Sequence, residues 1–229
     1  MRACMFDFSG TVFRIEPCED WLRAVLADEG IEADPETVTA YARRLERAGA
    51  QPGGARPERI PPHLVAAWAD RDLTAELHRA AYTGLSRTAG LPWDVHDALY
   101  DRQSAPAAWA PYPDAAEVLG ALRERGVPVA IVSNIGWDLR PVFRAHGLDS
   151  LVDVFVLSCE HGAQKPDPRL FRVACEALGA APERTLMVGD DRTADGGAAA
   201  LGCPVLLVDH LPVAERPDAL RGVLDLIGR

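Results

Sequence analysis

Hydrophobic residues along the chain gather in short runs, separated by polar segments with helical spacing. The clearest run is VPVAIVSN, residues 127–134, a largely β-branched stretch typical of a strand buried on both faces of a parallel sheet. Similar runs recur through the second half, and the helical segments between them end at glycines such as Gly147 and Gly179. Strands that alternate with helices indicate an α/β fold with a doubly wound parallel sheet. We predict strands at residues 2–8, 127–134, 152–158, 184–190 and 204–209, and later helices at residues 137–146, 168–178, 193–201 and 214–227.

Residues 14–110 differ, because the apolar periodicity in them is helical. One helix is predicted to open on Asp34 as its N-cap and to close on Gly49. Residues 51–62 are rich in glycine and proline and predict a loop, after which residues 63–85 are helical again. We predict no strand in this region. The chain is therefore expected to have a core of residues 1–13 and 111–229 and an all-helical insert of residues 14–110.

The composition of the chain argues against some classes of partner and indicates the cellular compartment. The net charge is −10 and lysine and arginine do not cluster, which argues against a nucleic-acid partner. No apolar run approaches the roughly 18 residues that cross a bilayer, and the N-terminus lacks the pattern of a signal peptide. The five cysteines are scattered and form no CxxC pair, as expected of reduced thiols. We expect a cytoplasmic protein that acts on a small molecule, away from membranes.

Four groups of polar residues follow the ends of predicted strands. Because the carboxyl ends of parallel strands form the ligand-binding edge of such a sheet, we expect these groups to meet there. One of them stands out, since Lys165 is the single lysine among 24 cationic residues. In chain order the groups are Asp7 with Ser9, Gly10 and Thr11; Ser133 with Asn134; Lys165; and Asp190 with Asp191 and Asp195.

These residue types suit the transfer of a phosphoryl group. The carboxylate of Asp7 can attack phosphorus and hold it as an acyl phosphate, which divides a difficult hydrolysis into two steps. Mg²⁺ takes oxygen ligands and binds phosphate oxygens, so an ion held by Asp7 and Asp190 would neutralise the opposing negative charges. Further help comes from the charge of Lys165, the hydroxyl of Ser133 and the backbone N–H groups of the turn at Gly10 and Thr11.

The order of the motifs, Asp-x-x-Gly-Thr, Ser-Asn, Lys-Pro and Gly-Asp-Asp-x-x-x-Asp, resembles the haloacid dehalogenase superfamily over nearly the whole chain. The helical insert is similar to that superfamily's cap domain, which closes over small substrates. The resemblance implies a Rossmann-like core, Mg²⁺ as cofactor and a small phosphorylated metabolite as substrate. The roles it implies are Asp7 as nucleophile; Ser133 and Lys165 as phosphate holders; Asp190 as a metal carboxylate supported by Asp191 or Asp195; and Ser9 as a metal ligand through its backbone carbonyl. From their positions we also expect Gly10, Thr11 and Asn134 to bind the phosphate.

Ser9 departs from the pattern of the phosphatases in this superfamily. They carry an aspartate there, which protonates the leaving alcohol and then activates the water that cleaves the acyl phosphate. A serine keeps the carbonyl that would bind the metal, but its hydroxyl does not titrate near neutral pH. Since general acid–base catalysis typically contributes about 10²–10⁴-fold, efficient hydrolysis of phosphomonoesters is in question. We nevertheless count Ser9, with Asp7, Ser133 and Lys165, among the catalytic residues.

Four functions remain open. The first is a Mg²⁺-dependent phosphatase that is slow, or is rescued by another acid, and the insert offers Glu16, Glu19, Asp20 and His63. The second, cleavage of a carbon–phosphorus bond, needs a cap lysine in the relatives that perform it, and the insert has none. The third is dehalogenation of a 2-haloacid, in which Asp7 attacks carbon without a metal. The fourth is a catalytically impaired protein that binds a phosphorylated ligand or a partner protein.

Overall fold

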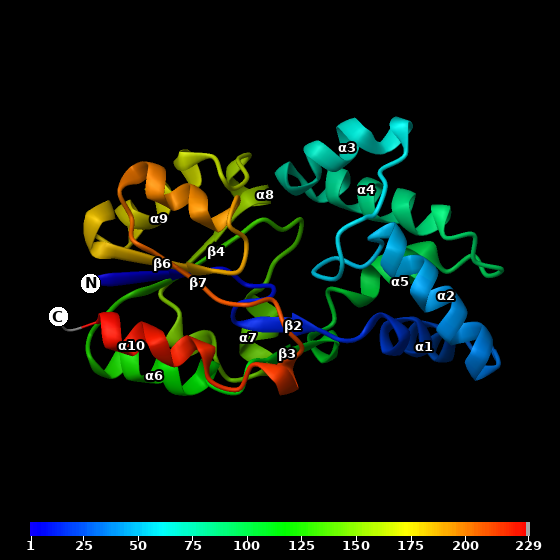
Figure 1. The fold of residues 1–229 in the computed structure, drawn as a ribbon, viewed down its shortest axis with the longest axis horizontal. Helices are drawn as coiled ribbons and strands as arrows, with labels where there is room; N and C mark the ends of the chain where they lie inside the picture. Colours follow the sequence, from blue (N-terminus) through cyan, green and yellow to red (C-terminus); the bar gives the residue numbers. More distant parts are fainter. Residues whose placement is uncertain (228–229) are drawn as a thin grey trace.

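A five-stranded parallel sheet organises the core of the computed structural model, which describes residues 1–227 (Figure 1). The strand order is β5-β4-β1-β6-β7, so the first strand lies at the centre. The five strands predicted from the hydrophobic runs are confirmed, with shorter bounds. They are β1 (Ala3–Phe6), β4 (Val129–Ser133), β5 (Val154–Leu157), β6 (Thr185–Gly189) and β7 (Val205–Leu207).

Side chains alternate across the sheet and bury it on both faces. In β1, Cys4 and Phe6 face a cluster that includes residues of α6 (Ala115–Glu124), α7 (Arg140–Ala145) and α10 (Gly222–Leu226). Ala3 and Met5 face the opposite cluster, formed with α9 (Pro168–Ala177) and the 3₁₀ helix η6 (Asp195–Leu201). Helices on both faces of a parallel sheet confirm the doubly wound α/β fold.

The insert has a hydrophobic cluster of its own, in which Trp21, Leu45, Leu85 and Leu99 are fully buried. The helix predicted between Asp34 and Gly49 is confirmed: Asp34 accepts a hydrogen bond from the Thr37 N–H, and Gly49 ends the helix at φ +64°. Figure 1 shows these helices grouped beside the core. They are α1 (Cys18–Asp28), α2 (Pro35–Ala48), η1 (Pro62–Leu64), α3 (Val65–Ala69), η2 (Arg71–Leu73), α4 (Ala75–Thr88) and α5 (His96–Arg102).

A two-stranded antiparallel ribbon joins the insert to the core, so the prediction of no strand in residues 14–110 is wrong at both ends of that region. The ribbon pairs β2 (Phe13–Ile15) with β3 (Trp109–Pro111), and Ile15 lies opposite Trp109. Each strand has three residues, too few for an alternation to be recognised in the sequence. The ribbon brings both connections of the insert to one place.

Four predicted helices are interrupted, shortened or altered. Residues 214–227 do not form one helix, because the residue before Pro217 is disfavoured in helical conformation and Arg216 adopts φ −133°. Residues 63–85 break between α3 and α4, where the Thr74 side chain caps α4. Of predicted residues 193–201, only 195–201 are helical; they form the 3₁₀ helix η6 and contain Gly196 and Gly197, which are poor helix formers. The helix predicted at residues 137–146 is shorter in the structure, because α7 covers only part of that range.

The remaining short helices are α8 (Ser158–His161), η3 (Pro106–Ala108), η4 (Asp149–Leu151), η5 (Pro182–Arg184), η7 (Val213–Glu215) and η8 (Ala219–Arg221).

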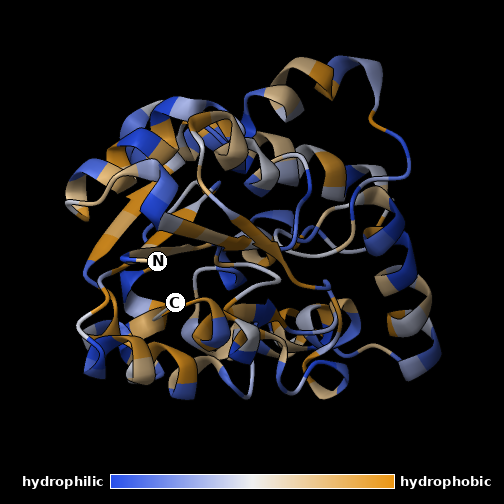
Figure 2. Cartoon of the chain, turned by 60° about the vertical axis from the view of Figure 1, so that its left-hand side comes forward, coloured by the Kyte–Doolittle hydropathy of each residue, from blue (hydrophilic) through white to orange (hydrophobic). Residues whose placement is uncertain are grey.

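Hydropathy follows the layers of the fold. Figure 2 shows hydrophobic strands in the middle of the core and alternating hydrophobic and hydrophilic residues on the surrounding helices. Within residues 1–227, none of the helices combines the length and the apolar character needed to span a membrane.

Candidate active site

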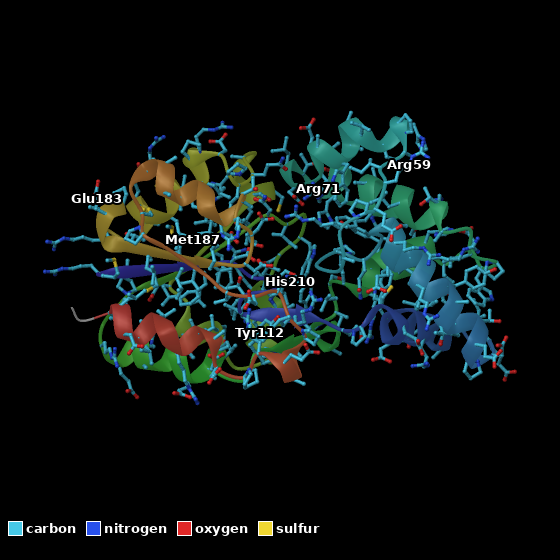
Figure 3. All side chains as sticks on the ribbon, in the orientation of Figure 1. Arg59, Arg71, Tyr112, Glu183, Met187 and His210 are labelled. Atoms are coloured by element: carbon cyan, nitrogen blue, oxygen red, sulfur yellow. The ribbon has the colours of Figure 1, made fainter. Side chains whose placement is uncertain are left out.

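A cavity of about 810 Å³ lies where the carboxyl ends of β1, β4 and β6 meet the insert. Figure 3 shows Arg71 at this junction, on the side of the insert that faces the core, and His210 on the core side. The sequence groups predicted to meet at this edge all contribute to its walls. The core supplies Asp7, Ser9, Ser133, Asn134, Lys165, Asp190, Asp191 and Asp195, and the insert supplies Gly53, Trp68, Arg71, Asp72, His78 and Tyr82 among others.

Lys165 lies at the centre of the polar residues. Its ammonium donates to Asp7 Oδ1 at 2.7 Å and to Asp195 Oδ1 at 2.5 Å, and all three side chains are buried. Asn134 fixes the backbone of Lys165: its Nδ2 donates to the Lys165 carbonyl at 2.9 Å, and its Oδ1 accepts from the Lys165 N–H at 2.6 Å. The amide of Asn134, predicted at the phosphate, is thus used to position the lysine. Ser133, at the end of β4, is 2% exposed and lines the cavity.

Burial sets the ionisation of this group. It raises the pKa of Asp7 to about 8, and the Lys165 ammonium opposes that rise. The neighbouring carboxylates of Asp195 and Asp7 hold the pKa of Lys165 above its usual value, against the effect of burial. Lys165 therefore stays cationic. Its charge is shared between the carboxyl groups of Asp7 and Asp195.

Three carboxylates converge closely enough to share one cation. One oxygen from each of Asp7, Asp190 and Asp195 lies within 4.8 Å of the others. Asp191, predicted with them, lies outside this group. Its Oδ1 accepts from the N–H groups of Thr193 and Ala194, its Oδ2 pairs with Arg56, and its own N–H donates to Asp195 Oδ2. Its carboxylate is thus committed to the turn and to the insert.

His210 is a site residue that the sequence analysis missed. It follows β7, and its Nδ1 contacts Asp190 Oδ2 while its Nε2 contacts Arg14 Nη1. Arg14 also donates to the Gly53 carbonyl at 2.9 Å, which links the core to the insert. No motif includes His210. The only available signal was its position beyond the end of a predicted strand, at the same edge as the other groups.

The turn after Asp7 is held from within and from the C-terminal segment. The Gly10 N–H donates to the Phe13 carbonyl at 2.7 Å, and the Thr11 N–H points to the Phe8 carbonyl at 3.4 Å. These two N–H groups, predicted as phosphate donors, are thus occupied inside the turn. Arg216, also missed, donates to the carbonyls of Gly10 and Thr11. The break in the predicted C-terminal helix allows this contact.

A loop of the insert covers Ser9. The Ser9 hydroxyl donates to the Gly53 carbonyl at 3.5 Å, and Gly53 has φ +76°. A Cβ at position 53 would lie 2.6 Å from Ser9 Oγ and 2.8 Å from the Trp109 ring. The space beyond the short serine is therefore occupied by the glycine loop.

The acids proposed to replace a carboxylate at position 9 do not lie in this cavity. Glu16 forms an ion pair with Arg102 at 2.8 Å and lines a different pocket, and Glu19 and Asp20 pair with the exposed Arg23. His63 is exposed and is not among the residues that line the cavity. The insert instead presents Asp72 and His78 to it.

Comparison with known proteins identifies the class to which this arrangement belongs. The family model described as haloacid dehalogenase-like hydrolase matches residues 1–202. The chain belongs to this family, and it is accordingly a hydrolase with the Rossmann-like core of that superfamily, as predicted.

The relatives of the chain include both dehalogenases and phosphatases. (S)-2-haloacid dehalogenase 4A of Burkholderia cepacia is 33% identical over 88% of this chain and 80% of its own length. Phosphoserine phosphatase of Thermus thermophilus is 40% identical, but the match covers 47% of this chain and 44% of that relative. Ribulose-1,5-bisphosphate 5-phosphatase of Halopiger xanaduensis is 29% identical over 95% of this chain and 87% of its own length.

Solved structures resemble the whole chain. A dehalogenase in an intermediate complex has a TM-score of 0.67 and 27% identity, and the match covers 100% of this chain and 98% of that one. L-2-haloacid dehalogenase of Xanthobacter autotrophicus has a TM-score of 0.63 and 25% identity, over 94% of this chain and 81% of that one.

Proposed function

We propose that the protein is a Mg²⁺-dependent phosphatase that hydrolyses a small phosphorylated metabolite through an aspartyl-phosphate intermediate. The observation that carries the proposal is the group of Asp7, Asp190 and Asp195, three carboxylates that converge in the cavity, two of which pair with Lys165. Attack of a carboxylate on carbon needs no such group, whereas attack on an anionic phosphate requires neutralisation of charge. A cytoplasmic location remains a prediction.

The donor set fits Mg²⁺. Carboxylate oxygens are the ligands this ion prefers, and one ammonium does not balance three carboxylates. Asp7, Asp190 and the Ser9 carbonyl would hold the ion, with Asp195 fixed beside them by Lys165 and the Asp191 N–H. When bound, Mg²⁺ supplies Lewis-acid stabilisation of the phosphate charge.

The other steps of the proposed reaction are assigned to side chains around the cavity. Asp7 Oδ would attack phosphorus, and the Lys165 ammonium would bind the phosphate oxygens that approach it. Ser133 would donate its hydroxyl to the same oxygens, and Asn134 keeps Lys165 in place through its two backbone hydrogen bonds. Ser9 contributes no proton, so the reaction needs an acid from elsewhere or a leaving group that departs without one.

Dehalogenation of a 2-haloacid is the second candidate. It is favoured by the similarity to (S)-2-haloacid dehalogenase 4A over most of both chains and by the absence of a carboxylate at position 9. In that reaction Asp7 would displace halide from carbon and form an ester. The two reactions differ in their products and in their need for a metal, so one assay separates them.

The test is a screen of the purified protein against phosphomonoesters, acyl phosphates and 2-haloacids, each with Mg²⁺ and with EDTA. We expect phosphate release that requires Mg²⁺ and is lost in Asp7→Asn. Asp225→Asn is the matched control, because Asp225 is exposed on α10. Halide release that survives EDTA would instead support dehalogenation. Full phosphatase activity of Asp7→Asn would contradict the assignment of Asp7 as the nucleophile.

A further inference from the structure

The cavity contains one buried carboxyl group that the proposed chemistry has not used. Besides the three grouped carboxylates, its acidic residues are Glu46, Asp72 and Asp191. Glu46 is exposed on α2, and Asp191 is committed to its turn and to Arg56. Asp72 is 3% exposed and lies on η2 of the insert. It is therefore the buried acid that the insert contributes to the cavity wall.

The break between α3 and α4 presents Asp72 to the core. η2 packs against α4 on one side and against α8 of the core on the other. Two further contacts hold this face of the insert closed: Gln164 Nε2 donates to the Ala69 carbonyl at 2.6 Å, and the His78 side chain lies directly over Gly136. Asp72 is thus held at the junction of insert and core, close enough to Lys165 for the positive charge of that lysine to lower the pKa of Asp72.

The Asp72 carboxyl group is buried without a hydrogen bond from any of residues 1–227. Arg71 Nη2 approaches its Oδ2 at 3.2 Å as an ion pair, and His78 Nε2 lies 3.8 Å from its Oδ1, too far for a hydrogen bond. Arg71 is itself engaged, because its Nη1 donates to the Trp68 carbonyl and its guanidinium stacks on the Trp68 ring. The Oδ1 oxygen, which has no partner closer than His78 among the described residues, can carry a proton and deliver it into the cavity.

Burial, and not the charged groups around Asp72, favours the protonated form of its carboxyl. Burial raises the pKa of Asp72, and Arg71 and then Lys165 oppose the rise. On α4, burial lowers the pKa of His78 to about 3 and raises that of Tyr82 to about 12, so both are neutral near pH 7. On α8, the pKa of the Cys159 thiol is raised, chiefly by burial and in part by Asp72, and Glu160 is paired with Arg140.

We propose that Asp72, supplied by the insert, is the general acid and base that Ser9 cannot be. The inference rests on the proposed phosphatase function. As Asp7 bonds to phosphorus and the bond from phosphorus to the leaving oxygen breaks, the proton of the Asp72 carboxyl passes to that oxygen. Water then attacks phosphorus, the Asp7 oxygen leaves, and the water proton returns to Asp72, so the cycle restores both residues.

The test compares leaving groups in Asp72→Asn and in wild type. p-Nitrophenolate departs without protonation, whereas an alkoxide does not. With an alkyl phosphate we expect kcat/KM to fall about 10²–10⁴-fold, the usual contribution of a general acid. With p-nitrophenyl phosphate the first-turnover burst should keep its rate, while later turnovers slow because the base is missing. The alkaline limb of the wild-type pH profile for the alkyl ester, where the acid loses its proton, should disappear.

Two variants control this experiment. Asp70→Asn removes an exposed carboxylate two residues away and should behave as wild type. Asp72→Glu restores a carboxyl group and should recover part of the alkyl activity. Melting temperatures measured alongside would reveal a merely structural role, in which alkyl and aryl substrates lose activity together.

The outcomes separate the two proposals. An unchanged alkyl rate in Asp72→Asn, or equal losses with both leaving groups, overturns the role of Asp72 while wild-type phosphate release sustains the phosphatase. Absence of phosphate release from wild type with every ester overturns the phosphatase itself, and the role of Asp72 with it.

Discussion

Ser9 and Gly53 form a matched pair, since the short side chain on the core meets the residue without a side chain on the insert. The Ser9 hydroxyl lies 3.5 Å from the Gly53 carbonyl, so a carboxylate at position 9 would be directed at a carbonyl oxygen. Repulsion between the two acceptors would turn it away from a leaving group bound in the cavity. Position 9 is therefore adapted to the loop above it.

Replacing Ser9 by aspartate should consequently give little gain. We expect Ser9→Asp to raise kcat/KM for alkyl phosphates by far less than the about 10²–10⁴-fold that a working general acid supplies. Ser9→Ala, which removes the hydroxyl without adding bulk, is the control and should keep the wild-type rate. Steady-state kinetics at saturating Mg²⁺ measure both. A gain of several hundredfold in Ser9→Asp would mean that the missing carboxylate is the only defect of the site.

Sequence motifs predicted the residues whose chemistry is tied to a fixed spacing. Asp7, Lys165, Asp190 and Asp195 follow strand ends, and the structure brings them together. Asp72, His210 and Arg216 could not be found in this way. Each belongs to a segment of no regular spacing, and each reaches the site only because a predicted helix is broken or a strand has ended.

At the scale of elements, the loop that contains Gly53 connects the insert to the turn that follows Asp7. Its carbonyl accepts hydrogen bonds from Arg14 and Ser9, and its backbone has a positive φ that disfavours a side chain. The loop thus positions the insert over Asp7 through backbone groups, and its geometry depends on a glycine.

Gly53→Ala should damage both stability and turnover. The new methyl group would meet Ser9 and Trp109 at less than 3 Å, so the loop must move away from the cavity. Gly90→Ala is the matched control, because Gly90 has a similar φ of +62° with nothing within 4 Å of the added Cβ. We expect both variants to lose about 1 kcal/mol from backbone strain, and only Gly53→Ala to lose more and to lower kcat/KM. Equal kinetics in the two variants would contradict a role for the loop.

Whether a helix or strand could be predicted from the sequence depended on its length and on whether tertiary contacts determine its structure. The buried strands and the capped helices α2 and α9 carry local signals, and the sequence predicted them. The ribbon of β2 and β3 is stabilised by pairing between distant segments, and the C-terminal helix is broken by Pro217 and by the Arg216 contacts with the Gly10 turn. Neither arrangement follows from local propensity.

At the scale of the whole molecule, metal binding should couple to folding. The residues that would hold the cation come from the ends of β1 and β6, and in the unfolded chain they are far apart. A ligand that binds only the folded state at about 100 times its Kd adds about 2.7 kcal/mol to the free energy of unfolding. For a chain of this size that corresponds to a rise in Tm of about 5–10 °C.

Thermal unfolding with Mg²⁺ and with EDTA measures this coupling. We expect the rise in wild type and in Asp225→Asn, and its loss in Asp190→Asn, which removes one carboxylate of the group. An equal rise in Asp190→Asn would place the bound metal elsewhere on the protein.

The central position of β1 has a consequence for the order in which the chain folds during synthesis. β1 is made before both of its partners, since β4 and β6 come after residue 128. The hydrophobic cluster of the insert lies in one continuous stretch between Cys18 and Leu99, so it can form on the ribosome before the core exists. At about 5–20 residues per second, β1 waits roughly 6–25 s for β4 to be made. Throughout that interval the apolar strand β1 lacks both of its partners in the sheet, so during synthesis this strand is the segment of the core most in need of chaperone protection.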